Sequence, residues 1–424
     1  MQLSSRTRPT VTKLPVLQYG CRTVAGPQEG NEISFNYLSE GGANYVFSID
    51  PWNQLDRRRP RIIFVTNTGS VVPKNQVLGK VMRISKGVLK TLNSQEVISG
   101  LLTEIIPLFE LPNFSTKNTS SALNTKQIPT STLPTSRLVS LKALPTNRMN
   151  PTLTQHLMEH EGVDLPSEVI QELYDEVYQK SSHMGRERIT LKVEAQWGIL
   201  LPNLSSVPGK SLTIEVKPKW LEQSRKAPQD AYRCRNCALR ASKPAEDKQN
   251  AYLCPLYLVA GNASVIQPWV KRKVLDAFGT LPEPQPEQKM VENITDHITH
   301  YIVAGKGHRL ISHIKHQQVR LDTEAELKQG ETALTAKQET SLRLAMTLKD
   351  CSLYIKVSYS DKDLPIESWL GDLDFKSPQK IKGWGLKETA LVDGGWYTQR
   401  DVGGERLDCM ISAARDENVA LHHS

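Results

Sequence analysis

The segment Glu215–Lys219 places one carboxylate and two ammonium groups within five residues of each other, in the order Glu-Val-Lys-Pro-Lys. Alternate residues of an extended chain face the same side, so Glu215, Lys217 and Lys219 would share one face while Leu212, Ile214 and Val216 enter the core. Pro218 cannot donate to a ladder, which predicts that the strand ends here or lies at an edge beside a cleft. A solvated strand face with ion pairs is the simpler explanation of this run alone.

A second acidic segment, Gly371–Lys376, carries Asp372 and Asp374 two residues apart, followed by Lys376. If it is extended, these three side chains share a face. Two carboxylates so close repel each other unless a cation lies between them, and magnesium prefers such oxygen ligands together with phosphate oxygens. Lys376 and Lys380 would then lie beside the metal and hold phosphates. An acidic turn is the alternative.

Asp350 stands alone immediately before a predicted strand over 352–359. From that position its carboxylate can reach into a cleft and accept a proton from a hydroxyl, as phosphoryl transfer requires. A capping or turn role is the alternative for an isolated aspartate.

A glycine-tipped hairpin is predicted at Glu40–Asn44, whose sequence is Glu-Gly-Gly-Ala-Asn. Small residues let backbone N–H groups approach nucleotide phosphates, although an ordinary hairpin turn would look the same. The strand near 77–85 carries Lys80 and Arg83 on opposite faces, so only one of them can point at a nucleotide.

Cys234 and Cys237 have a spacing that suits zinc, and Cys254 follows. No fourth ligand is evident from the sequence, because no histidine falls between Met184 and Ile294. We therefore expect buried cysteines and no zinc. Six cysteines in 424 residues are too sparse for a disulfide framework, so we expect reduced thiols.

The composition narrows the class of binding partner. The net charge of +8 and pI near 9.0 indicate a polyanionic partner, but an aromatic content of 6% and scattered basic residues argue against nucleic acid. No stretch approaches the roughly 20 apolar residues that span a bilayer. We expect an intracellular monomer, in the nucleus, the cytoplasm or both, without membrane insertion.

The order of predicted elements indicates an α+β protein with a small β-rich first part and a larger mixed second part. Residues 1–30 read as a loosely ordered arm, 31–165 as the first part and 166–424 as the second, with a Ser/Thr/Pro-rich insertion near 112–137. Strands are expected over 35–49 (a hairpin), 61–67, 77–85, 189–219 and 352–359, and helices over 94–107, 167–180, 265–278 and 288–328.

In order along the chain, six motifs resemble those of the inositol-pentakisphosphate 2-kinases, most closely the fungal branch. They are Glu40–Asn44, Glu215–Lys219, Cys234–Cys237, Cys254–Leu256, Lys349–Ser352 and Asp372–Lys376. The resemblance implies a two-lobed kinase-like fold that transfers the γ-phosphate of ATP to the 2-hydroxyl of inositol pentakisphosphate and gives inositol hexakisphosphate. Five phosphates on one ring would also require many Lys and Arg donors, which the basic composition supplies.

The resemblance also implies roles for single residues. Asp350 would activate the hydroxyl, Asp372 and Asp374 would hold Mg²⁺, and Lys217 would act at the seam between nucleotide and substrate. ATP would contact Gly41, Gly42, Ala43, Asn44, Arg83, Asn203 and Glu215. The substrate phosphates would bind Lys217, Lys219, Lys243, Lys376 and Lys380.

Some positions depart from the family pattern. Tyr257 stands where the family has the Asp of Cys-Pro-Leu-Asp, Ala238-Leu239 replaces a Met-His pair, and a family arginine corresponds to either Arg186 or Arg188. No counterpart of the zinc-binding segment of the plant members is found. The alternatives are a basic nucleic-acid-binding protein with a cysteine-based metal module and a protein kinase, although the His-Arg-Asp and Asp-Phe-Gly motifs of protein kinases are missing.

Overall fold

The structure is a computed structural model. It describes residues 17–27, 30–53, 60–88, 91–110, 151–181, 196–244, 251–282, 286–322, 334–361, 363–400 and 409–422. The expected insertion at 112–137 and the candidates Arg186 and Arg188 lie outside these ranges. Within them, no helix combines the length and apolar composition that crossing a bilayer requires.

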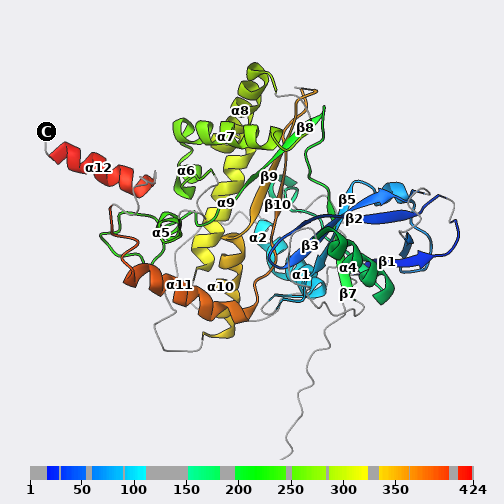
Figure 1. The fold of residues 1–424 in the computed structure, drawn as a ribbon. Helices are drawn as coiled ribbons and strands as arrows, with labels where there is room; N and C mark the ends of the chain where they lie inside the picture. The colour runs from blue at the N-terminus through cyan, green and yellow to red at the C-terminus, as the bar shows by residue number, and fades with distance from the viewer. Residues whose placement is uncertain are drawn as a thin grey trace, which may run out of the picture.

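The first sheet is a closed barrel with the strand order β1-β4-β2-β3-β5-β7-β6 (Figure 1). All neighbouring pairs are antiparallel except β1 with β6. Its strands are β1 (Leu17–Val24), β2 (Ile33–Glu40), β3 (Asn44–Pro51), β4 (Arg61–Thr66), β5 (Lys80–Ser85), β6 (Glu161–Leu165) and β7 (Gln196–Pro202).

The predicted hairpin is confirmed as β2 and β3. Along β3, Tyr45, Phe47 and Ile49 are buried while the residues between them are partly exposed, as the alternation of the sequence predicts. Helix α4 (Ser167–Ser181) packs Val169 and Ile170 into the same apolar core. The predicted helix over 94–107 is also present, as α1 (Ser94–Gly100), a π-helical turn (Leu101–Ile105) and α2 (Ile106–Phe109).

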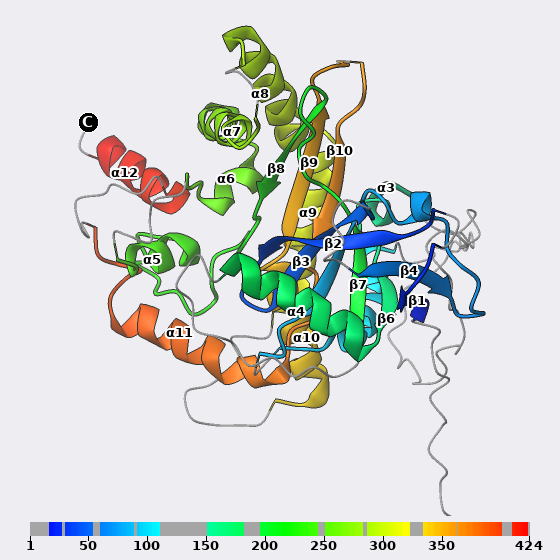
Figure 2. The ribbon, with the colours of Figure 1, turned by 45° about the vertical axis from the view of Figure 1, so that its right-hand side comes forward.

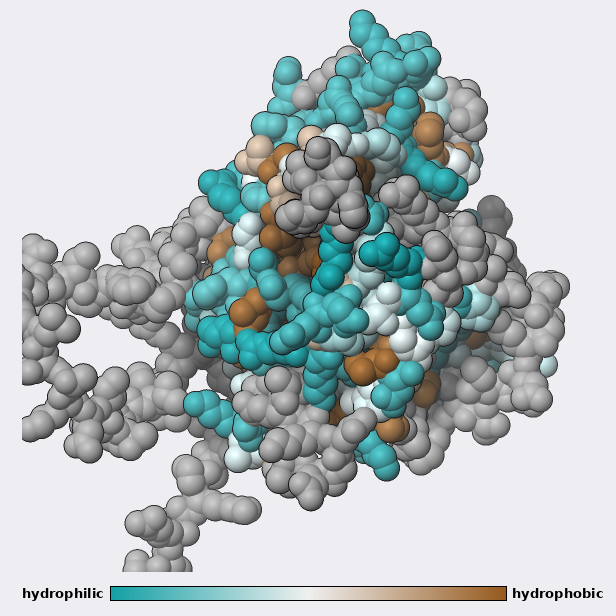
Figure 3. All heavy atoms as spheres, turned by 90° about the vertical axis from the view of Figure 1, so that its left-hand side faces the viewer, coloured by the Kyte–Doolittle hydropathy of each residue, from teal (hydrophilic) through white to brown (hydrophobic). Residues whose placement is uncertain are grey.

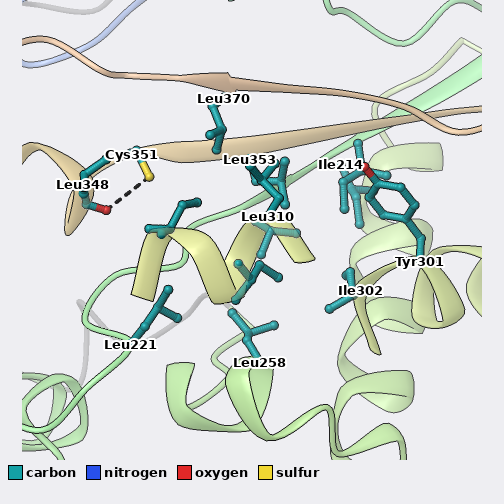
Figure 4. Close-up of a cluster of buried hydrophobic side chains, with 14 of the residues drawn as sticks. Ile214, Leu221, Leu258, Tyr301, Ile302, Leu310, Leu348, Cys351, Leu353 and Leu370 are labelled. Carbon is teal, nitrogen blue, oxygen red and sulfur yellow. Dashed lines mark hydrogen bonds between the residues drawn. The ribbon is translucent and has the colours of Figure 1, made fainter. Parts of the chain in front are cut away.

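The second sheet has three antiparallel strands in the order β10-β9-β8. They are β8 (Ser211–Val216), β9 (Ser352–Ser358) and β10 (Glu367–Gly371). Side chains from one face of this sheet, including Ile214, Leu353 and Leu370, share a core with Leu258, Tyr301, Ile302 and Leu310 from the helices (Figure 4). In Figure 2 these strands run alongside the helices, beside the barrel.

The second part also contains a series of helices. They are α5 (Arg235–Ala241), α6 (Pro255–Ala260), α7 (Ala263–Phe278), α8 (Gln288–Val303), α9 (Lys306–Leu321), α10 (Ala336–Leu348), α11 (Ile381–Asp393) and α12 (Met410–His422), and a short helix α3 (Pro151–Thr154) precedes β6. The mixed α+β class that the sequence predicts is therefore confirmed.

Two expectations about chain organisation differ from the structure. The prediction of a loosely ordered arm over residues 1–30 is wrong for β1. This strand pairs with both β4 and β6 and buries Cys21. The expected division at 165/166 also differs, because β7 pairs with β5 and β6 and thus belongs to the barrel. The change from one sheet to the other falls between Pro202 and Ser211.

Candidate active site

The candidate site lies where three strand ends of the second sheet meet. Val216 at the end of β8 pairs with Leu353, and Gly371 at the end of β10 pairs with Ser352, so the end of β8, the start of β9 and the end of β10 share one edge. The topology therefore gathers three predicted motifs that are far apart in the sequence. The predicted strand end at Pro218 is confirmed, and β8 is an edge strand as expected.

Asp350 lies between two ammonium groups at this edge. Its carboxylate oxygens accept hydrogen bonds from Lys219 Nζ at 2.9 Å and from Lys376 Nζ at 2.8 Å. Burial alone would raise the pKa of Asp350, but the two lysines outweigh it and lower the pKa to about 2. The side chain remains 53% exposed, so the charge cluster is open to a ligand.

A second group joins Glu215 and Asp372 through one hydroxyl. Ser352 Oγ lies 2.7 Å from Glu215 Oε1 and 3.0 Å from Asp372 Oδ2, yet a hydroxyl has one proton to donate. Lys217 Nζ is 3.2 Å from Glu215 and 3.6 Å from Asp372. Burial lowers the pKa of Lys217, but these carboxylates outweigh it and raise the pKa.

These donors fit a hard divalent cation. Glu215 and Asp372 are carboxylates with side chains 37% and 48% exposed, and they share one ammonium and one hydroxyl. Oxygen ligands that retain negative charge and stay accessible are what Mg²⁺ takes together with phosphates. The structure thus places Glu215, which sequence reasoning assigned to the nucleotide, next to Asp372.

Asp374 makes a different contact from Asp372. Its Oδ1 accepts a hydrogen bond from Arg83 Nη2 at 2.9 Å, and Arg83 comes from β5 of the barrel, so this ion pair joins the barrel to the second sheet. Burial raises the pKa of Asp374, but the charge of Arg83 outweighs it and lowers the pKa. Burial also lowers the pKa of His160 to about 4, so this ring is neutral at pH 7.

The backbone at two site residues is left-handed. Lys219 has φ 55° and Asp372 has φ 53°, and among the described residues no other non-glycine residue has a positive φ. Such a conformation costs about 1–2 kcal/mol and persists only where surroundings hold it. At Lys219 the support is Gln318, whose Nε2 donates to the Lys219 carbonyl at 2.8 Å. Asp372, Asp374 and Lys376 were expected to share a face only if their segment is extended, and the left-handed backbone at Asp372 means that this condition is not met.

Helix α10 positions Lys376. Arg343 Nε donates to the Lys376 carbonyl at 2.6 Å, and the Lys376 amide donates to Thr347 Oγ1 at 3.2 Å. Lys380 lies within electrostatic reach of Lys376 and Asp350. Burial and then the charge of Lys376 lower the pKa of Lys380, and the charge of Asp350 opposes both effects. Both lysines that sequence reasoning placed after the acidic pair are therefore close to Asp350.

The remaining predicted residues lie outside this cluster of contacts. The Gly41 amide donates to the Asn44 carbonyl at 2.9 Å, and a Cβ on Gly41 or Gly42 would meet nothing within 4 Å. Packing within the protein therefore does not require these two glycines. Ala43 completes this turn between β2 and β3.

Asn203 and Lys243 are also separate from the Asp350 contacts. Asn203 follows β7, and its Oδ1 accepts a hydrogen bond from the Ser205 amide at 3.0 Å. Lys243 is exposed just after α5, and no ion pair joins it to the cluster within the described part of the chain.

Sequence reasoning missed the functional contacts of Ser352, Gln318 and His160. Ser352 stood within the quoted Lys349–Ser352 motif, and its place at the start of a strand beside Asp350 was an available signal. Gln318 lies on a helix 99 residues from Lys219, and nothing in its local sequence indicates that contact.

Comparison with known proteins adds an independent line of support. The model of the family described as inositol-pentakisphosphate 2-kinase matches residues 37–390, which include every residue of the cluster. A curated inositol-pentakisphosphate 2-kinase of Yarrowia lipolytica is 26% identical over 272 residues, covering 59% of this chain and 78% of that protein.

Proposed function

The chain belongs to the inositol-pentakisphosphate 2-kinase family, and on this premise we propose that the cluster around Asp350 is the active site. The chain is an inositol-pentakisphosphate 2-kinase, a transferase. The observation that carries the assignment of the site is the carboxylate of Asp350 between Lys219 and Lys376, beside the Glu215 and Asp372 pair.

Asp350 is the proposed general base that accepts the proton of the substrate 2-hydroxyl. Its low pKa would make it a weak base while both lysines neutralise it. Phosphates of the substrate would compete for the same ammonium groups, because phosphate oxygens accept charge-assisted hydrogen bonds as carboxylate oxygens do. Substrate binding would therefore raise the pKa of Asp350 toward its ordinary value and strengthen the base.

The proposed phosphate ligands are Lys217, Lys219, Lys243, Lys376 and Lys380. Lys219 and Lys376 are supported by their contacts with Asp350, because a lysine beside the base is also beside the reacting hydroxyl. Lys217, which bridges Glu215 and Asp372, is proposed to lie between the nucleotide and the substrate. Its ammonium group would neutralise charge on the phosphoryl group during transfer. Lys243 rests on the family resemblance alone.

Mg²⁺ is the proposed metal, held by Asp372 and Asp374, with Glu215 close to Asp372. When bound, the ion supplies positive charge that neutralises the nucleotide phosphates. Asp374 would exchange part of its contact with Arg83 for the metal. Ser352 orients the Asp372 carboxylate through its hydroxyl.

ATP is proposed to lie between the barrel and the second sheet, in a two-lobed kinase-like arrangement. Gly41, Gly42, Ala43 and Asn44 would cover its phosphates, and the open space around Gly41 and Gly42 supports that role. Arg83 would contact the nucleotide, since its buried Nε has no hydrogen-bond partner among the described residues. Asn203, at the end of the barrel strand β7, and Glu215, in β8, would face the nucleotide from the two sheets.

Turnover of defined substrates tests this proposal. Purified protein is incubated with magnesium-ATP and inositol pentakisphosphate, and the products are separated by anion-exchange chromatography. We expect inositol hexakisphosphate from the wild type and none from Asp350→Ala. Product formation by the wild type with undiminished turnover in Asp350→Ala would leave the activity intact and refute the site.

A further inference from the structure

Four cysteines from three separate segments converge in the second part of the protein. Cys234 caps the start of α5 and Cys237 lies in its first turn, Cys254 precedes α6, and Cys409 precedes α12. Their four sulfurs all lie within 4.8 Å of one another. Each residue is at most 1% exposed. Figure 3 shows the side of the molecule on which α5 and α12 lie in Figure 1, and most of its coloured surface is hydrophilic.

The spacing of the sulfurs fits one tetrahedral metal ion. A Zn–S bond of about 2.3 Å places neighbouring sulfurs of a tetrahedron about 3.8 Å apart, and Cys234 Sγ lies 3.7 Å from Cys254 Sγ. That distance is far too long for a disulfide, whose sulfurs lie about 2.05 Å apart, and all four thiols are free. A multi-iron cluster binds its cysteines to different irons and would hold the sulfurs further apart.

Donors around the sulfurs suit thiolates. The Cys234 amide donates to Cys409 Sγ at 3.2 Å, and the Cys237 amide donates to Cys234 Sγ at 3.5 Å. The Tyr252 hydroxyl lies 3.3 Å from Cys237 Sγ. Hydrogen bonds from N–H and O–H groups to ligand atoms fix the ligands and stabilise their negative charge.

We propose that Cys234, Cys237, Cys254 and Cys409 together bind one structural zinc ion. A buried set of four thiolates selects zinc among common divalent ions, and four protein ligands leave no open position for catalysis. Cys409 could not be recognised as the fourth ligand from the sequence, because it lies 155 residues beyond Cys254 and outside the span 37–390 that the family model matches. The expectation of buried reduced cysteines is confirmed, but the expected absence of a zinc site is replaced by this proposal.

The ion would fasten α5 to the chain that surrounds the active site. Within α5, Asn236 Nδ2 donates to the Trp220 carbonyl at 3.2 Å, and the Arg235 guanidinium lies 4.1 Å from the Trp220 ring centroid. Trp220 directly follows Lys219, whose backbone is left-handed. A metal that fixes α5 and the start of α12 therefore helps to hold the turn that presents Lys219.

Metal analysis tests the site without ATP or inositol phosphate, so its outcome is independent of the proposed activity. Untagged full-length protein is purified, passed through a metal-free column and analysed by plasma mass spectrometry. We expect about one zinc per chain in the wild type, as a closed four-cysteine site requires. Protein grown with cobalt should show the visible absorption of tetrahedral thiolate-bound Co²⁺.

Variants decide whether these cysteines are the ligands. Cys409→Ser should lose most of the zinc, whereas Cys21→Ser, which alters a buried cysteine of the barrel, should keep it. If Cys409→Ser fails to fold, the zinc content and cobalt spectrum of the wild type still decide the proposal. Wild-type protein with no zinc, with iron instead, or with a disulfide in this group would overturn it, as would unchanged zinc in a folded Cys409→Ser.

Discussion

The cluster around Asp350 and the group of four cysteines both unite residues that are distant in the sequence, but they differ in exposure. Asp350 is 53% exposed and keeps its charges at the surface of the sheet edge, whereas each of the four cysteines is at most 1% exposed. One group offers carboxylates and ammonium groups, and the other offers only sulfur.

Exposure decides what each group can do. Opposite charges near the surface can exchange partners, so a phosphate can replace a carboxylate at Lys219 or Lys376 at small cost. Four buried sulfurs enclose a ligand completely and leave it no position for a substrate. Changes in the Asp350 cluster should therefore alter turnover, and changes among the cysteines should alter stability.

The largest effect should come from Asp350→Asn, which keeps the shape of the side chain but removes the base. We expect kcat to fall about 10²- to 10⁴-fold, the contribution typical of a general base, while the melting temperature changes little because the residue is half-exposed. Steady-state kinetics and thermal unfolding measure the two quantities. Asp361→Asn, which neutralises an exposed aspartate after β9, is the matched control and should leave kcat unchanged. Equal kcat for Asp350→Asn and the wild type would remove Asp350 from the mechanism.

The second effect should come from the cysteines and appear in stability. Loss of a structural zinc removes binding free energy that also stabilises the fold, so Cys409→Ser should unfold at least about 5 °C below the wild type. A chelator should lower the melting temperature of the wild type but not further lower that of Cys409→Ser. Cys21→Ser also disturbs a buried cysteine, yet its melting temperature should still respond to the chelator. An unchanged melting temperature of the wild type in the presence of the chelator would contradict a stabilising metal at these cysteines.

The same two groups show what the sequence could predict. The alternation from Leu212 to Val216 correctly predicted which side chains enter the core, because a strand face repeats every two residues. Pro218 correctly predicted the strand end, because proline cannot donate to a ladder. These are local rules, and they bring Glu215, Lys217 and Asp350 to strand ends without any knowledge of tertiary contacts.

The contacts between distant segments could not be predicted in this way. Nothing near Arg83 indicates its ion pair with Asp374, 291 residues away, and nothing near Cys409 indicates Cys234. The left-handed turn at Asp372 overrides the extended pattern of its segment because tertiary contacts with Ser352 and Lys217 hold it. Strand β1 does alternate, with Leu17, Tyr19 and Cys21 at every second position, but this short signal lies in a segment rich in Pro, Gly and Thr and was missed. Its pairing with β4 and β6 stabilises it.

A third effect concerns substrate affinity. Lys219→Ala removes one ammonium group from the proposed phosphate site, so KM for inositol pentakisphosphate should rise about 10- to 100-fold, the value of one charged hydrogen bond. KM for ATP should change far less. Lys210→Ala is the control, because it removes the same charge from an exposed position before β8 and should alter neither constant. A parallel rise in both KM values for Lys219→Ala would indicate a general loss of structure and not a lost phosphate contact.

The smallest effect is a pH dependence of stability that belongs to Asp350 alone. Its pKa is lowered from the ordinary 3.8 to about 2, so the carboxylate binds protons less readily in the folded than in the unfolded chain. The resulting stability is present above pH 3.8 and is lost as the pH falls through about 2. Because the side chain is 53% exposed, the contribution should stay below about 1 kcal/mol. Urea unfolding can compare the free energies of unfolding of the wild type and Asp350→Asn between about pH 6 and pH 2.5, and their difference should shrink as the pH falls. A constant difference would mean that Lys219 and Lys376 do not hold this carboxylate in solution.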